Sequence, residues 1–165
     1  MKTVLFVCTG NTCRSPMAEA VMDDLAEDYP SIRSRVRVKS AGTMACEDAK
    51  IEDLAEEALE SRGMDASHHR ARQLTPELAE EADLILTMDA QHLEELEALC
   101  PEAYEKAHTL KGYASHVDGF PGDEEYDIAD PFREPYEVYV EVLDEIIESV
   151  KKLLARLSKE WKDED

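Results

Sequence analysis

The chain has 165 residues and is 43% hydrophobic, which suits one globular domain over 1–160 followed by a short acidic tail at 161–165. No apolar run approaches the roughly 20 residues that span a bilayer, and the opening MKTVLFVC is too short for a secretory signal, so we expect a cytoplasmic protein. With 39 acidic against 18 basic residues, the net charge of −21 argues against nucleic acids and anionic membranes as partners.

Apolar runs of strand length alternate with segments of helical period, a pattern typical of an α/β fold with a parallel sheet. The predicted strands cover residues 3–7, 35–39, 84–88 and 107–110. The first and third are expected to lie in the centre of the sheet, because strands buried on both faces show apolar runs in place of alternation.

Helices are predicted between these strands. The first follows the stretch CTGNTCRS, with Ser15 as its cap and Pro16 at its first position. Apolar stripes predict one helix from about 51 to Gly63 and another that begins after Asp89, and a further helix is predicted to start at Thr75-Pro76. The longest carries apolar residues over 136–161 at alternating spacings of four and three, which suits a coiled-coil seam or a helix that covers one face of a sheet. We favour the second interpretation.

The stretch CTGNTCRS, residues 8–15, lies on the turn between the first strand and the first helix. A loop in this position points several backbone N–H groups into one concavity, where the helix dipole adds partial positive charge. Phosphate suits this nest because Arg14 offers a fork of donors to two of its oxygens. Gly10 is expected to supply a positive φ in the tight path. The predicted phosphate-binding residues are Thr9, Gly10, Asn11, Thr12, Cys13 and Arg14.

Cys8 stands at the first position of this nest, where the N–H groups, Arg14 and the Ser15 hydroxyl would stabilise its thiolate. The pattern C-x5-R-S therefore predicts attack by Cys8 on phosphorus, with Arg14 stabilising the equatorial oxygens. The alternative is a buried structural cysteine near a surface arginine, since C-x5-R alone occurs often by chance. The strand before the stretch and the helix after it favour the chemical interpretation.

The segment VLFVCTGNTCRSPMAEA resembles the active-site signature of the low-molecular-weight protein tyrosine phosphatases. The resemblance extends to SAGT (40–43), HRARQLT (69–75), ADLILTMD (82–89) and DPFREPYEVYVEVLDEI, and so covers nearly the whole chain. It implies a three-layer, flavodoxin-like α/β sandwich in which helices flank a four-stranded parallel sheet. It also implies a phosphocysteine intermediate on Cys8, phosphorylated proteins as substrates, and no metal or other cofactor.

The same resemblance assigns roles to residues outside the C-x5-R pattern. Asp130, in the DPF segment, matches the family's general acid, which protonates the leaving group and then activates water to hydrolyse the thiophosphate. Asn11 and Ser15 match residues that brace the loop and the thiolate, and His69 matches a supporting histidine. Without the resemblance, Asp130 stands out little among 39 acidic residues, because an Asp-Pro step is typical of a turn.

Thr12 bears on the choice of substrate. The chain resembles the protein arginine phosphatase branch of this superfamily, which carries Thr in the loop where tyrosine phosphatases carry a branched aliphatic residue, usually Ile. A hydroxyl faces the N–H donors of a phosphoarginine guanidinium more favourably than a methyl group does. Phe132 is expected to form an apolar wall against the methylene stem of the substrate. Acidic residues near the presumed rim would favour a cationic substrate, namely Asp118, Asp123, Glu124, Glu125 and Asp127.

Other functions on the same loop stay open at this stage. A phosphotyrosine phosphatase would use the same chemistry. Arsenate reductases of this fold need a further cysteine pair, whereas this chain offers only Cys46 and Cys100, and it has Pro16 where those enzymes usually carry Gln. A module that binds phosphate without turnover would lack one of the reactive residues, and all of them are present.

Cys13 lies five residues after Cys8, close enough that oxidation could join the two thiols and shield the nucleophile from irreversible oxidation. Packing of the loop by a small side chain explains Cys13 equally well. Both interpretations stay open.

Overall fold

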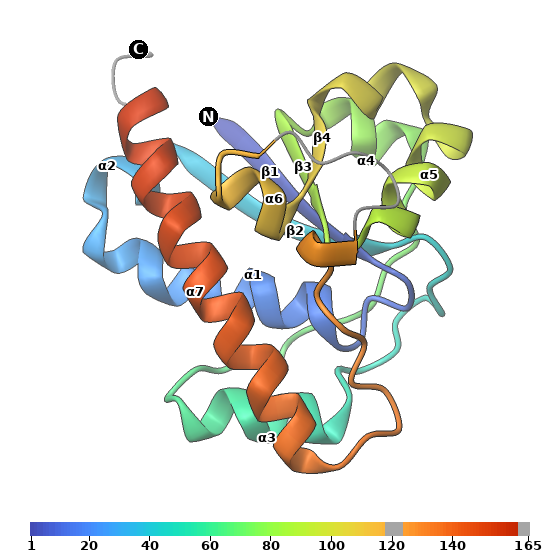
Figure 1. The fold of residues 1–165 in the computed structure, drawn as a ribbon, viewed down its shortest axis with the longest axis vertical. Helices are drawn as coiled ribbons and strands as arrows, with labels where there is room; N and C mark the ends of the chain where they lie inside the picture. Colours follow the sequence, from blue (N-terminus) through green and yellow to red (C-terminus); the bar gives the residue numbers. More distant parts are fainter. Residues whose placement is uncertain (118–123, 162–165) are drawn as a thin grey trace.

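Within residues 1–117 and 124–161, which this computed structural model describes, four parallel strands form one sheet in the order β2-β1-β3-β4 (Figure 1). The strands are β1 (Lys2–Cys8), β2 (Val36–Gly42), β3 (Leu84–Thr87) and β4 (Ala107–Thr109). The predicted sheet is therefore confirmed, with β1 and β3 in its centre. Strand β2 continues past its predicted end at 39, so that Gly42 pairs with Cys8 at the last register position of β1.

Helices cover both faces of the sheet (Figure 1). Their bounds are α1 (Arg14–Leu25), α2 (Pro30–Arg33), α3 (Asp53–Ser61), α4 (Pro76–Glu81), α5 (Ala90–Leu99), α6 (Leu110–Ala114) and α7 (Tyr136–Glu160). Short 3-10 helices are η1 (Ala26–Asp28), η2 (Pro101–Lys106) and η3 (Glu124–Tyr126). The helices predicted from apolar period are confirmed, whereas α2, α6 and the 3-10 turns are too short to show a period.

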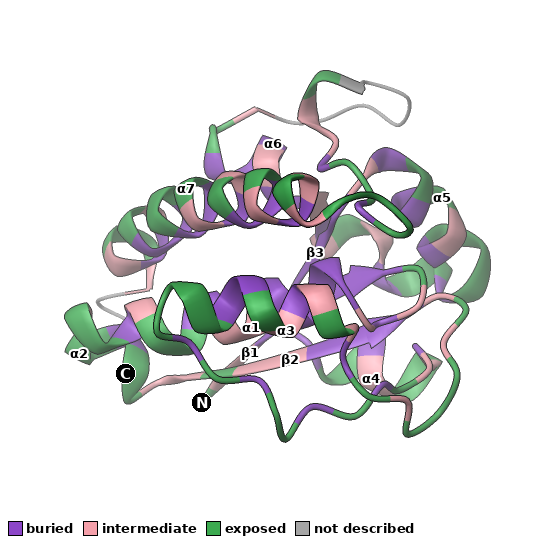
Figure 2. Cartoon of the chain, turned by 90° about the horizontal axis from the view of Figure 1, so that it is seen from below, coloured by how far each residue is buried: buried purple, intermediate pink, exposed green. Residues whose placement is uncertain are grey.

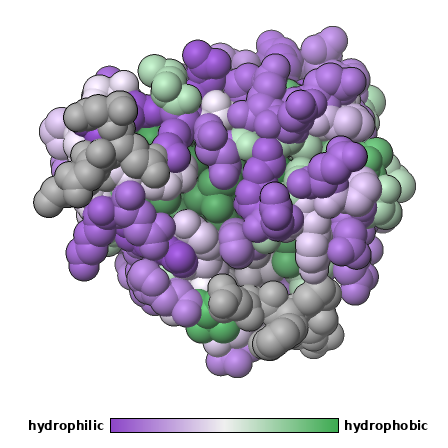
Figure 3. Space-filling model, turned by 90° about the horizontal axis from the view of Figure 1, so that it is seen from above, coloured by the Kyte–Doolittle hydropathy of each residue, from purple (hydrophilic) through white to green (hydrophobic). Residues whose placement is uncertain are grey.

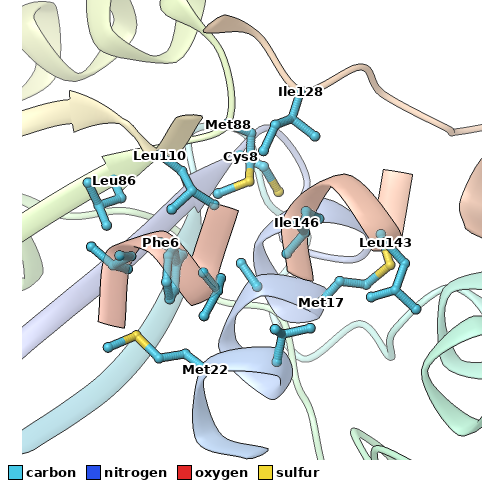
Figure 4. Close-up of a cluster of buried hydrophobic side chains, with 14 of the residues drawn as sticks. Phe6, Cys8, Met17, Met22, Leu86, Met88, Leu110, Ile128, Leu143 and Ile146 are labelled. Atoms are coloured by element: carbon cyan, nitrogen blue, oxygen red, sulfur yellow. The ribbon is translucent and has the colours of Figure 1, made fainter. Parts of the chain in front are cut away.

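The alternation of side chains along β1 separates two hydrophobic clusters. Phe6 points to the face covered by α1, α3, α6 and α7, where it packs among residues such as Met22 and Ile146 (Figure 4). Leu5 and Val7 point to the opposite face, toward α4, α5 and η2. Cys8 continues the alternation of Phe6 and therefore lies at the edge of the first cluster.

Helix α7 covers one face of the sheet, as predicted, and packs against α1, α3 and α6. Its buried residues face the interior, while exposed residues line the outer side (Figure 2). The buried stripe is wider than the predicted one and includes Tyr139, Val142, Ile146 and Leu153, with Val140 and Ile147 at its margin. The apolar stripe of α7 is therefore buried against other helices of the same chain, which disfavours the coiled-coil alternative.

The surface in Figure 3 is mostly hydrophilic, with hydrophobic residues in small separate areas, as the charge of −21 leads one to expect. Among the described residues, no helix combines the length and the hydropathy required to cross a bilayer. Of the predicted acidic tail, only Trp161 is described. It is half-buried against the core, with the Lys2 ammonium 5.0 Å from the centre of its ring.

Candidate active site

Residues 8–15 form the loop from β1 to α1 at the carboxyl end of the sheet, where parallel α/β folds place their ligands. The two residues after β2 support this loop, because Thr43 N–H donates to the Cys8 carbonyl and Met44 N–H donates to the Thr9 carbonyl, both at 2.9 Å. A Cβ on Gly42 would collide with the Thr9 carbonyl oxygen, so glycine at this position permits the close approach of the two backbones.

Asn11, and not Gly10, takes the left-handed conformation in the loop, with a φ of 57°. The prediction for Gly10 was wrong because asparagine adopts this region readily and here gains hydrogen bonds by doing so. Its fully buried amide donates to the hydroxyls of Ser15 (2.8 Å) and Ser40 (2.9 Å), and its Oδ1 accepts from the Arg72 N–H at 2.9 Å. These bonds fix the conformation of the loop.

Ser15 does not cap α1, contrary to the prediction. The N-cap position is Cys13, which makes no side-chain cap, and Ser15 lies within the first turn. The Ser15 hydroxyl lies 2.8 Å from the Cys8 sulfur. Because that hydroxyl already accepts from the Asn11 amide, its own hydrogen is available to the sulfur. With the Asn11 N–H at 3.3 Å, two donors face Cys8.

His69 supports the loop from behind. Its Nε2 lies 2.7 Å from the Asn11 carbonyl oxygen, which can only accept, so Nε2 carries the hydrogen. Burial lowers the pKa of His69 below its usual value, which favours the neutral ring at pH 7. The structure thus brings Asn11, Ser15 and His69 together beside Cys8.

Arg14 is buried and held from two sides. Its Nη1 donates to Asp89 Oδ2 at 3.0 Å and to the Ile128 carbonyl at 2.9 Å, while Nη2 lies 3.7 Å from Asp130 Oδ2. Sequence reasoning did not assign Asp89 to the site. The sequence signal for Asp89 was its place two residues after the end of the central strand β3, at the same edge of the sheet as the loop.

A cavity of about 190 Å³ lies over the loop. Its lining joins most of the predicted site residues and consists of Cys8, Thr9, Gly10, Thr12, Cys13, Arg14, Asp130 and Phe132. A larger hollow of about 500 Å³ beside Trp161 has no cysteine or histidine among its described lining residues. The smaller cavity is therefore the candidate active site, because it combines a nucleophile with an anion nest and a carboxylate.

The outer wall of this cavity is more exposed than its floor. The Asp130 side chain is 50% exposed, and its Oδ1 accepts from the Phe132 N–H at 3.0 Å. Phe132 is 48% exposed, and the Arg133 guanidinium lies 5.2 Å from the centre of its ring. Arg133 has a φ of 67°, which is a strained conformation for this residue type.

Only part of the acidic rim predicted near Asp130 falls within the described residues. Asp118, Asp123 and the side chain of Glu124 lie outside them. Asp127 accepts from the Ala90 N–H at 2.9 Å and so supports the start of α5. The effect of this rim on a substrate stays a prediction.

Cys13 is buried, and its sulfur lies 4.0 Å from the Tyr139 hydroxyl. Burial raises the pKa of Cys13 to about 12, so this thiol is protonated at neutral pH. All four cysteines are free thiols in the structure. Among the described residues, no three His, Cys, Asp or Glu side chains gather as ligands of a metal would.

The loop, the parallel sheet and the buried arginine define a phosphate-handling α/β protein with a cysteine at the centre of its site. The chain belongs to the low molecular weight phosphotyrosine protein phosphatase family, whose model matches residues 3–163.

Individual relatives resemble the chain over nearly its full length. It is 40% identical to a protein-arginine-phosphatase of Geobacillus stearothermophilus, over 95% of this chain and 97% of the relative. It is 31% identical to the low molecular weight protein-tyrosine-phosphatase Etp of Escherichia coli strain K12, over 96% of this chain and 91% of that relative. A solved cysteine-to-serine mutant of the arginine phosphatase YwlE, with a phosphorylated active site serine, superposes with a TM-score of 0.85 and 36% identity, over 95% and 96% of the two chains.

Proposed function

We propose that this protein is a cysteine-dependent phosphatase that removes the phosphoryl group from phosphoarginine side chains of proteins. The observation that carries the proposal is that Thr12 lines the same cavity as Cys8 and Arg14, which supports a contact between its hydroxyl and the substrate. The similarity to named arginine phosphatases supports the same substrate. The phosphorylated serine of the mutant relative supports a covalent intermediate at the equivalent of Cys8.

In the first step, the Cys8 thiolate attacks phosphorus while the bond from phosphorus to the arginine nitrogen breaks. The Ser15 hydroxyl oxygen and the Asn11 backbone nitrogen lie 2.8 and 3.3 Å from the sulfur, and their hydrogens stabilise the thiolate before attack. The loop N–H groups and Arg14 stabilise the phosphoryl oxygens, and Arg14 needs little reorganisation because Asp89 and Ile128 already hold it. Asp130 donates its proton to the departing nitrogen.

In the second step, the Asp130 carboxylate takes a proton from water as that water attacks the phosphocysteine. The sulfur–phosphorus bond breaks, inorganic phosphate forms, and Cys8 leaves as a thiolate. The exposure of Asp130 suits this role, because the carboxylate must meet both a leaving group and water. Asp130 therefore serves as acid in one step and base in the next.

The walls of the cavity support a choice of substrate. A guanidinium carries several N–H donors, and the Thr12 hydroxyl can accept from one of them at a position where a methyl group would leave it unpaired. Phe132 offers its ring to the methylene stem of the arginine. Phosphotyrosine is the second candidate substrate, because Phe132 can also pack on an aromatic ring and tyrosine phosphatases of this family are relatives.

An arsenate reductase activity has less support. Cys100 belongs to the hydrophobic cluster on the opposite face of the sheet from Cys8, and Cys46 is exposed. The two therefore do not supply a cysteine pair next to the nucleophile. Because Cys8 must stay reduced to act, we also propose a reducing, cytoplasmic setting for the enzyme, with phosphorylated proteins and not nucleic acids or membranes as its partners.

The test is to measure phosphate release by the wild-type protein from two peptides that differ only in a phosphoarginine or a phosphotyrosine at one position. The proposal predicts a larger kcat/KM for the phosphoarginine peptide. A preference for phosphotyrosine would replace it with the second candidate, and release from neither peptide would contradict both.

A further inference from the structure

His92, in the first turn of α5, is buried between the loop of residues 8–15 and Asp89, which holds Arg14. It is 1% exposed, and its Nε2 lies 2.9 Å from the Thr9 hydroxyl oxygen. Its Nδ1 lies 3.3 Å from the backbone nitrogen of Asp89, the residue that holds Arg14. One imidazole thus contacts both the second residue of the loop and the partner of its arginine.

The tautomer of His92 follows from its two partners. In the capping box of α5 the Asp89 backbone N–H, which can only donate, points at Nδ1, so Nδ1 presents its lone pair there. Asp89 Oδ1 also lies 3.2 Å from Nδ1, but this oxygen accepts from the His92 backbone N–H at 3.1 Å. The hydrogen of the neutral ring then lies on Nε2 and is donated to the Thr9 hydroxyl oxygen. Burial, the largest influence, lowers the pKa of His92 to about 4, so the ring is neutral at pH 7.

This tautomer directs the Thr9 hydroxyl. Because its oxygen accepts from His92, the hydroxyl hydrogen is free to be donated elsewhere. Among the described residues, the hydrogen bond to His92 is the only one that the Thr9 side chain makes. Thr9 also lines the cavity above Cys8, where a phosphoryl group would supply an acceptor.

We propose that the Thr9 hydroxyl donates a hydrogen bond to an oxygen of the bound phosphoryl group, and that His92 is the positioning residue that aims it. The inference rests on the proposed function for its phosphoryl ligand, and it adds a side-chain donor to the backbone donors of the loop. A hydroxyl that must both accept from a fixed donor and donate to an anion has one useful orientation, so His92 prepares the site before substrate arrives.

The first experiment measures the binding of inorganic phosphate to the Cys8→Ser protein by calorimetry, with and without a change at Thr9. Thr9→Val keeps the shape of the side chain but removes the donor, and should weaken binding about ten- to a hundredfold, as expected for a hydrogen bond to a charged group. Thr9→Ser keeps the hydroxyl and should bind within a few fold of the parent. Equal binding by the valine variant would overturn the role of Thr9.

Two variants of His92 separate its two contacts. The amide of His92→Gln reaches the place of Nε2 and keeps a donor for Thr9, whereas the amide of His92→Asn reaches only the place of Nδ1 and keeps the contact with Asp89. The asparagine variant should lose phosphate affinity as Thr9→Val does, and the glutamine variant should retain most of it. Equal losses of phosphate affinity in both variants, together with lower melting temperatures, would show that His92 only caps α5 and does not orient Thr9.

Two further measurements test the coupling between Thr9 and His92 and the tautomer of His92. Adding Thr9→Val to His92→Asn should weaken phosphate binding little further, because both changes remove the same donor. The nitrogen chemical shifts of labelled histidine should show Nε2 protonated at pH 7, with the His92 signals assigned by their loss in His92→Gln. A hydrogen on Nδ1 would reverse the bond to Thr9 and overturn the proposal.

His116→Asn serves as the matched control, because His116 is exposed and lines a hollow with Lys152 and Lys159, away from the loop. It should leave phosphate binding unchanged. The binding assays need no turnover, so they distinguish the two proposals. A wild-type protein that hydrolyses neither phosphopeptide would contradict the proposed function, while Thr9 and His92 would still be tested by phosphate affinity.

Discussion

The two sides of the cavity are built differently. On the floor, Cys8, Asn11 and Arg14 are almost fully buried, and each bonds to another part of the chain, the Cys8 carbonyl to Thr43, the Asn11 amide to Ser40 and the Arg14 guanidinium to Asp89. On the outer wall, Asp130 and Phe132 are each about half exposed, and the Asp130 carboxylate accepts a local hydrogen bond from the Phe132 N–H. The floor is thus fixed by the fold, whereas the wall is fixed mainly by its own turn.

This difference matches a division of labour. Phosphoryl transfer needs donors that are already in place when charge develops, which suits a buried and fully bonded floor. Release of the leaving group needs a carboxylate that meets both substrate and water, which suits an exposed wall. Variants of the floor should therefore affect every phosphorylated substrate alike, and variants of the wall should discriminate between leaving groups.

The largest effect is expected for Cys8→Ser, which removes the nucleophile from the floor and leaves the anion nest. Turnover should fall by roughly 10⁴-fold or more on every substrate, as when other enzymes lose a nucleophile. Inorganic phosphate should still bind, and mass spectrometry of the variant mixed with substrate should detect slow transfer of phosphate to the introduced serine. Near-normal turnover would contradict the covalent mechanism.

On the wall, Asp130→Asn should lower kcat by about 10²- to 10⁴-fold for protein substrates, because no proton reaches the departing nitrogen or oxygen. The loss should shrink for an aryl phosphate whose leaving group is stable without a proton. Steady-state rates on a series of leaving groups measure this dependence. A uniform loss across the series would show that Asp130 has another role.

Asn11 and Arg133 offer a matched comparison, because both adopt a positive φ, at 57° in the buried loop and at 67° in the exposed turn after Asp130. Asn11→Ala should lower the free energy of unfolding by about 2–4 kcal/mol, since it strains the backbone and leaves buried partners unpaired. Arg133→Gly should raise it by up to about 1 kcal/mol, since it relieves strain at an exposed position. Chemical denaturation measures both. A destabilised glycine variant would mean that the stacking of Arg133 on Phe132 outweighs the strain.

A smaller and reversible effect concerns Cys13. Peroxide should oxidise the Cys8 thiolate to a sulfenic acid, and the Cys13 thiol should displace water from it to form a disulfide that added thiol reduces. The protonated state of Cys13 makes this step slow at neutral pH. Peptide mapping detects the bond, and Cys13→Ala should prevent recovery of activity. Unchanged recovery in that variant would leave Cys13 with a packing role only.

The sequence predicted those features that depend on local pattern. The apolar runs located the strands of the sheet, and the spacing of Cys8 and Arg14 placed both in one loop between a strand and a helix. Asp130 could be chosen among 39 acidic residues only through the family resemblance, because nothing near it in sequence marks it as an acid.

Features that depend on contacts across the sheet were not predicted. Ser40 reaches the loop from β2, Asp89 reaches it from the N-cap of α5, and His92 reaches Thr9 across 83 positions of sequence. Local pattern also misplaced two roles, since Gly10 and Ser15 suit a turn and a cap by residue type. The positive φ belongs to Asn11 instead, and Ser15 lies inside the first turn of α1, where its predicted contact with Cys8 is found and its predicted cap is not.

The most direct test of the account is the substrate preference of Thr12→Ile, with Thr12→Ser as its control. Replacing the hydroxyl by apolar bulk removes a contact for the guanidinium and offers an aromatic ring a surface to pack on. The ratio of kcat/KM for phosphotyrosine over phosphoarginine peptides should rise by roughly ten- to a hundredfold in the isoleucine variant and change little in the serine variant. An unchanged ratio in Thr12→Ile would contradict the assignment of phosphoarginine as the substrate.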